Sequence, residues 1–163
     1  MIKRLLLLLV CIAIILSLLT SCQDGDAIFS YCEANLPLGE EFKAVSDKNF
    51  DAVWSNGKYT VALLRISFVA AVNEGIAETM TPYEFGIFWI DKCGRDANII
   101  NDGAVYCEYY SEDVHGEAEV FYLEAFYRSA YAYFVILFAA PPAEEEAGRV
   151  DFLNYAKSVY FNI

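Results

Sequence analysis

The chain has 163 residues, of which 57% are hydrophobic and 16% aromatic, and its 11 basic and 23 acidic residues give a formal charge of −12. This length suffices for one ordinary domain with its own core. An acidic chain without a basic patch repels nucleic acid and anionic lipid headgroups alike, so nucleic-acid binding is not expected.

The first 22 residues have the pattern of a signal peptide that ends at a cysteine. Lys3 and Arg4 precede an apolar run over residues 5–19, and Leu19-Thr20-Ser21-Cys22 follows. This tetrapeptide resembles the lipobox of bacterial lipoproteins, which implies cleavage before Cys22 and a lipid on its thiol. As a helix, residues 5–19 reach about 22 Å against a hydrocarbon core of about 30 Å, which disfavours a retained transmembrane anchor. We therefore expect lipid anchoring at the extracytoplasmic face of the cell membrane, with ordinary secretion as an alternative.

Removal of residues 1–21 leaves 142 residues with nine basic and 23 acidic side chains, a formal charge of −14. Residues 22–28 continue with Gln, Asp and Gly, a composition typical of a short tether. Residues 29–163 are then predicted to form a single domain.

Three of the five cysteines remain for the folded domain, because Cys11 leaves with the signal peptide and Cys22 takes the lipid. Cys32, Cys93 and Cys107 would lie in a compartment where disulfides persist, so one pair among them is possible. The spacing does not select a pair, and three free thiols are an equal alternative. Zinc is disfavoured because His115 is the only histidine, and neither a metal nor a cofactor is expected.

The first half of the domain is predicted to contain strands and a short helix. A strand over Phe29–Asn35 is followed by a break at residues 36–39. Strands over Phe50–Trp54 and Lys58–Phe68 flank Ser55-Asn56-Gly57, which predicts a β-hairpin because Asn and Gly tolerate positive φ. A weaker helix is predicted over Val69–Ile76.

A stronger helix begins at Thr81-Pro82-Tyr83-Glu84. Threonine at the N-cap, proline at the first helical position and glutamate at the third form a capping box. The helix should run to about Cys93, where Gly94 supplies the left-handed residue that ends it.

The second half is predicted to be mostly antiparallel sheet closed by a helix. The expected elements are strands Ala97–Ile100 and Ala104–Ser111 around a turn at residues 101–103, strands Glu117–Tyr127 and Ala130–Ala139 joined at Arg128-Ser129, a helix over Ala143–Lys157 after Pro141-Pro142, and a closing extended segment over residues 158–161.

The segment from Tyr122 to Phe161 reads as strand, tight turn, aromatic strand, proline break, helix and a terminal Ser-Val-Tyr-Phe. It resembles the end of PsbP-like domains, a family named for an extrinsic subunit of photosystem II. Leu36-Pro37, the Asn56-Gly57 hairpin and the helix from Thr81 fit the same order of elements. The resemblance implies an α+β fold, an α/β sandwich whose mostly antiparallel sheet is flanked by helices, and an accessory or protein-binding role without catalysis. Nothing in the chain points to photosynthesis.

The strand alternation predicts a sheet with two apolar faces, which helices on both sides would explain. A sharper hypothesis is that some of the tyrosines line a partly open surface for a protein or a small apolar ligand. The residues assigned to it are Tyr106, Tyr110, Tyr122, Tyr131 and Tyr133.

The sequence thus predicts a membrane-anchored lipoprotein that acts as a non-enzymatic binding or protein-interaction module, with an envelope protein or a small apolar ligand as partner. The alternative is a ligand-binding or hydrolytic envelope enzyme without a recognisable motif. Hydrolysis would need His115 near a serine or cysteine. Acid–base chemistry would need an apposed carboxylate pair, for which Glu84 with Asp91 and Glu108 with Glu124 are candidates. No catalytic residue is assigned.

Overall fold

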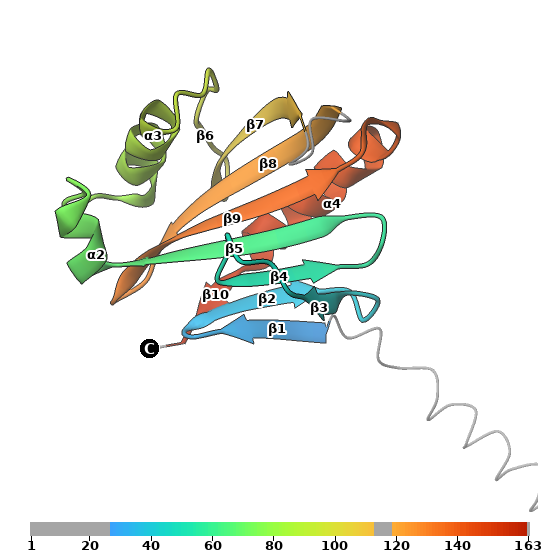
Figure 1. Cartoon of the computed structure of the whole chain (residues 1–163), viewed down its shortest axis with the longest axis horizontal. Helices are drawn as coiled ribbons and strands as arrows, with labels where there is room; N and C mark the ends of the chain where they lie inside the picture. Colours follow the sequence, from blue (N-terminus) through green and yellow to red (C-terminus); the bar gives the residue numbers. More distant parts are fainter. Residues whose placement is uncertain (1–26, 113–118, 163) are drawn as a thin grey trace, which may run out of the picture.

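A seven-stranded antiparallel sheet is the middle layer of the structure, a computed structural model that describes residues 27–112 and 119–162 (Figure 1). Its strand order is β3-β4-β5-β9-β8-β7-β6. The strands are β3 (Lys43–Val45), β4 (Ala52–Ser55), β5 (Thr60–Ser67), β6 (Ile100–Asn101), β7 (Val105–Glu112), β8 (Glu119–Arg128) and β9 (Ala132–Ala140). The molecule is an α+β sandwich, as the sequence predicts.

Helices cover both faces of this sheet. α2 (Phe68–Asn73) and α3 (Pro82–Lys92) pack on the face that we call the α3 face, and α4 (Glu145–Ser158) packs on the opposite α4 face after the short 3-10 helix η1 (Pro142–Glu144). Among the helices of the described residues, none has both the length and the apolar composition that a membrane crossing needs.

A smaller sheet of three strands joins α4 on the α4 face. It consists of β1 (Ala27–Tyr31), β2 (Ala34–Leu38) and β10 (Tyr160–Phe161), in the order β1-β2-β10. Residues 36–38, expected as a break, are the second half of β2, and their two leucines are fully buried. The chain instead reverses before β2, at residues 32 and 33, where Cys32 adopts a left-handed φ of 50°. Two residues assigned to the tether, Ala27 and Ile28, belong to β1.

The predicted hairpin at Asn56-Gly57 and the predicted capping box at the start of α3 are both confirmed. Asn56 accepts hydrogen bonds at Oδ1 from the backbone N–H groups of Lys58 and Tyr59 at 2.9 and 2.7 Å, and Gly57 has a φ of 83°. Thr81 and Glu84 make both hydrogen bonds of the capping box. These local contacts fix the direction in which α3 leaves the preceding segment.

The strand predicted over Ala97–Ile100 is reduced to the two residues of β6. Ile100 and Asn101 pair with the start of β7, while the preceding residues run alongside α3. Ile99 packs there against the cluster beneath the helix. Residues 97–99 therefore cover the cluster beneath α3 and do not form a strand.

Alternation along the strands divides the apolar side chains into two clusters. Phe134, Ile136 and Phe138 of β9 face α4 and the small sheet, whereas Tyr133 and Val135 face α2 and α3. Each cluster is covered by helices on its own side of the sheet, which accounts for a sheet that is apolar on both faces.

Candidate functional site

The five tyrosines assigned to one binding surface lie on both faces of the large sheet. Tyr106 is buried on the α4 face, and Tyr110 on the same face is 48% exposed and donates a hydrogen bond to Glu145 of α4. Tyr133 is fully buried on the α3 face, where its hydroxyl donates to two backbone carbonyls of the segment before α3, at 2.7 and 3.0 Å. These three side chains serve the packing of the helices.

The other two tyrosines lie far apart along the α3 face. Tyr131 is 57% exposed in the turn between β8 and β9, next to α2. Tyr122 is half-buried near the start of β8, where β9 ends. The structure therefore does not bring the five tyrosines together, but Tyr122 lines a hollow that is described below.

The register of the strands arranges the side chains of the α3 face in three successive rows. From the end of the sheet where β5 begins, the rows are Thr60, Ala139, Tyr122 and Tyr109; then Val53, Ala62, Leu137, Glu124 and Cys107; then Leu64, Val135 and Phe126. The third row belongs to the cluster under α2 and α3, as do Tyr109 and Cys107 at the β7 end of the first two rows. Toward β5 the first two rows extend beyond these helices.

Glu124 of β8 is a buried carboxylate on this face, with 2% of its surface exposed. The indole Nε1 of Trp89 donates to one of its oxygens at 3.0 Å, and the guanidinium of Arg95 forms an ion pair with the other. Burial, reinforced by the Glu124 charge, raises the pKa of Tyr109, so that its phenol remains protonated beside this carboxylate. Two donors thus satisfy this charge inside an apolar layer.

The same cluster holds a stack of three side chains. The Arg95 guanidinium lies 4.8 Å from the ring centroid of Tyr109, and the Tyr109 and Tyr122 rings stack with centroids 5.3 Å apart and planes 22° apart. Cation–π and ring stacking contacts each stabilise such an arrangement by about 0.5–1.5 kcal/mol. Glu124 fixes Arg95, and the stack in turn positions Tyr122.

Tyr122 forms one wall of what we call the apolar hollow, a concavity of about 430 Å³ beyond the end of α3. Its lining residues come from four strands and the adjoining loops: Asp47, Phe50, Val53, Lys58, Thr60, Ala62, Val120, Tyr122, Leu137, Ala139 and Pro141. Val53 and Ala62 are buried at its floor, and Leu137 and Ala139 are half-buried. Size and lining fit a site for an apolar ligand.

Polar groups of the apolar hollow are at its exposed rim. Lys58 forms an ion pair with Glu144 at 2.9 Å, and Asp47 accepts a hydrogen bond from the backbone N–H of Asn49 at 2.7 Å. Thr60 is exposed at the first residue of β5. A ligand with an apolar body and a polar end would match this distribution.

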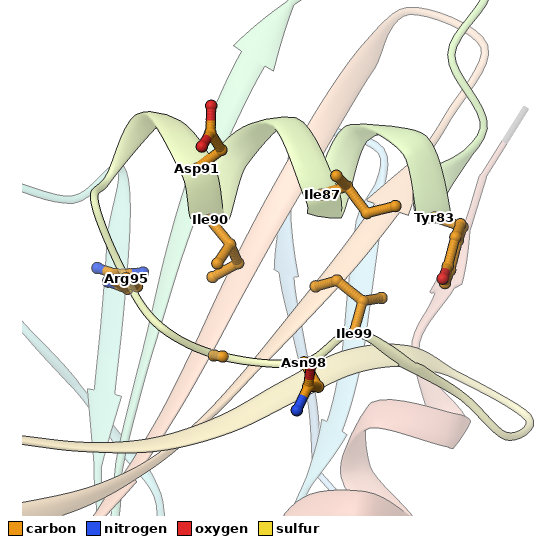
Figure 2. Close-up of a pocket in the computed structure, with 8 residues that line it drawn as sticks. Tyr83, Ile87, Ile90, Asp91, Arg95, Asn98 and Ile99 are labelled. Carbon is orange, nitrogen blue, oxygen red and sulfur yellow. The ribbon is translucent and has the colours of Figure 1, made fainter.

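A second hollow of about 320 Å³ lies between α3 and the segment that follows it (Figure 2). Ile90 and Ile99 point into this gap, Tyr83 lies at one end, Arg95 lies at the other, and Asp91 points away. The guanidinium of Arg95 is already engaged by Glu124 and Tyr109. This hollow is smaller, so the apolar hollow is the stronger candidate.

The carboxylate pairs considered for acid–base chemistry do not meet. Glu84 is bound in the capping box, while Asp91 points away from the gap beneath α3. Glu108 lies on the α4 face in an ion pair with Arg149, whereas Glu124 lies on the α3 face. His115 lies outside the described residues. Within residues 27–112 and 119–162, no group of three or more His, Cys, Asp or Glu side chains is placed to hold a metal ion.

Cys32, Cys93 and Cys107 are free thiols in the structure. Cys32 and Cys93 are exposed, and Cys107 is fully buried under α3. Burial, reinforced by the Glu124 charge, raises the pKa of the Cys107 thiol to about 12. At neutral pH this thiol is therefore protonated and out of contact with solvent.

The sequence reasoning missed the cluster around Glu124. One signal was available, since Glu124 interrupts the apolar run from Val120 to Phe126 on a strand that is buried on both faces. A single charge in such a strand indicates a buried partner. Its partners, Trp89 and Arg95, follow only from the packing of α3 on β8.

No protein-family model matches the chain, and no curated protein is similar to it in sequence. A crystal structure of a protein from Bacteroides thetaiotaomicron VPI-5482 is similar in fold, with a TM-score of 0.56 and 10% sequence identity. The similarity covers 86% of this chain and 50% of the other, so the chain spans about half the length of that protein. At this identity the likeness concerns the fold alone.

Proposed function

We propose that the chain is a lipid-anchored protein of the extracytoplasmic cell envelope that binds an apolar ligand in the apolar hollow and does not catalyse a reaction. The observation that carries the proposal is the hollow itself, an apolar concavity of about 430 Å³ on the large sheet. The lipobox-like Leu19-Thr20-Ser21-Cys22 supports the anchor. The order of strands and helices supports a PsbP-like domain.

The state of the nearby polar groups supports binding rather than catalysis. Glu124 is bound by Trp89 and Arg95, one at each carboxylate oxygen, and Lys58 is paired with Glu144. A general base needs a carboxylate or imidazole that reaches the substrate with its pKa tuned to the task. Engaged groups of this kind instead hold the walls of a site in place.

Binding is tested with the soluble domain from Gln23 onward, which retains both apolar clusters. The probe is a naphthylamine dye whose fluorescence rises in apolar surroundings. Ala139→Phe places a ring in the hollow and should weaken dye binding at least about tenfold. Val69→Phe, at a residue of α2 that is 81% exposed, is the matched control and should leave binding unchanged. Equal dye binding by all three proteins would contradict the proposed site.

Anchoring is tested separately on the full chain. Intact mass should show a diacylated chain that begins at Cys22, and Cys22→Ala should abolish both the mass increase and recovery with the membrane. Recovery of the unmodified chain among cytosolic proteins would contradict the proposed location. Hydrolysis of ester substrates that disappears with dye binding in Ala139→Phe would favour the enzyme instead.

A further inference from the structure

The apolar hollow lies at the end of the domain where the described chain begins. Ala27 pairs with Leu38 at the end of β2, and a short turn leads from there to β3. Lys43 of β3 pairs with Ser55, which in turn pairs with Thr60 at the rim of the hollow. Figure 1 shows the start of β1 and the β4–β5 turn at one end of the molecule and α2 at the other.

The predicted anchor is close to this end in sequence. Five residue steps separate Cys22 from Ala27. Even fully extended, they span at most about 18 Å. A lipid on Cys22 would therefore hold the hollow near the bilayer surface, with α2 on the distal side.

The backbone around the hollow cannot take up an extended peptide as an added strand. β5, β9 and β8 are inner strands, each paired on both sides, so their N–H and C=O groups are already bonded within the sheet. A peptide that adds to a sheet needs a free strand edge. The occupant must bind by burying apolar surface, as a hydrocarbon chain does.

The polar groups at the rim of the hollow and the net charge of the domain indicate which kind of lipid headgroup fits. The domain carries a formal charge of −14 once residues 1–21 are removed, which disfavours anionic lipids. The Lys58 ammonium at the rim is already paired with Glu144, so together with the Asp47 carboxylate the rim carries one cation and two anions beside the Thr60 hydroxyl. The ammonium of a zwitterionic headgroup complements such a rim.

We propose that the apolar hollow takes up an acyl chain of a zwitterionic phospholipid from the membrane to which the protein is anchored. The inference rests on the proposed function and names the class of its ligand. Val53, Ala62, Leu137 and Ala139 contact the hydrocarbon, Tyr122 closes one side, and the headgroup remains at the rim.

The test uses the lipidated full chain in phosphatidylcholine vesicles that contain a trace of phosphatidylcholine with a photoactivatable diazirine at the end of one acyl chain. After illumination, digestion and mass spectrometry should locate adducts on the peptides of β5 and β9. The same diazirine on the headgroup should instead label the rim around Asp47, Lys58 and Thr60 and leave Ala62 and Leu137 unlabelled.

Two variants make the result specific. Ala139→Phe fills the hollow, and Thr60→Trp narrows its exposed rim without disturbing the core, so each should reduce the adducts about tenfold. Val69→Phe should leave the adducts unchanged. Thermal unfolding of each variant shows that the loss is not a loss of fold.

Three outcomes would overturn the inference. Absence of acyl adducts while the naphthylamine dye still binds would reject the phospholipid and leave the apolar site in place. Adducts that form only from an acyl chain attached to Cys22 would assign the hollow to the protein's own lipid. Failure of the dye to bind would reject the proposed function together with the inference.

Discussion

The charge on Glu124 is stabilised by side chains that come from outside its own strand. Replacing Glu124 should therefore lower the free energy of unfolding by more than the small change in side-chain volume suggests. Glu124→Leu leaves the guanidinium of Arg95 without its counterion in a layer where that side chain is 34% exposed. We expect a loss of about 2–4 kcal/mol in the free energy of unfolding. Urea denaturation of the purified domain measures it.

The control for this substitution is the double variant Glu124→Leu with Arg95→Met, which removes both charges and keeps similar volumes. It should recover at least about half of the loss, because no unpaired charge remains buried. If the double variant is less stable than the sum of both single changes, the ion pair does not account for the effect.

At the scale of the element, α3 packs tightly against the sheet at Gly86. A Cβ there would lie 2.9 Å from a ring carbon of Phe126, which is itself buried in the cluster under the helix. Gly86→Ala gains helix propensity worth about 1 kcal/mol but must displace that ring, so we expect a net loss of about 1–2 kcal/mol.

Gly148→Ala in α4 is the comparison for Gly86→Ala. Its nearest neighbour would be the Cβ of Ala140 at 3.2 Å, a milder contact. In thermal unfolding, Gly86→Ala should have a lower melting temperature than Gly148→Ala. The reverse order would mean that α3 can move away from the sheet at little cost.

Elements with a local chemical cause could be predicted from the sequence. Asn56-Gly57 and the capping box at Thr81 act within four residues, and both are confirmed. The β1–β2 hairpin was missed because Cys32-Glu33 carries no turn signal, while Pro37 indicated a break. Pro37 fits in β2 because β10 pairs only with the first two residues of that strand.

At the scale of the whole molecule, one ion pair connects the small sheet to the large one. Arg65 of β5 binds both carboxylate oxygens of Glu33 at 3.2 Å, and Ser129 donates to the same carboxylate at 2.8 Å. Burial alone would raise the pKa of Glu33, but these hydrogen bonds hold it below its usual value near 4.5.

A lowered folded-state pKa means that the pair stabilises the protein above the unfolded pKa, and that this contribution is lost as the pH falls through the folded pKa. Glu33→Gln should therefore cost about 1–3 kcal/mol at pH 7, and this cost should fall as the pH is lowered below 4.5 toward pH 3. Urea unfolding of both proteins at the two pH values measures the difference. A cost that is independent of pH would show that the charge on Glu33 is not responsible.

The apolar hollow forms only when several strands of the large sheet are paired, which is why the sequence did not reveal it. The alternation in β7 and β9 was predicted correctly, but periodicity within one strand does not set the register between strands. Val53, Ala62, Leu137 and Tyr122 become neighbours only through three successive strand pairings. The lipid anchor and the PsbP-like resemblance stay predictions.

Because the three thiols differ in exposure, their rates of chemical modification can report how often α3 separates from the sheet. A maleimide should modify Cys32 and Cys93 rapidly, whereas Cys107 reacts only when α3 separates from the sheet. The rate of the slow modification therefore gives the frequency of that separation without any added label site. Two spin labels on the fast-reacting cysteines would report the spacing between the β1–β2 turn and the end of α3.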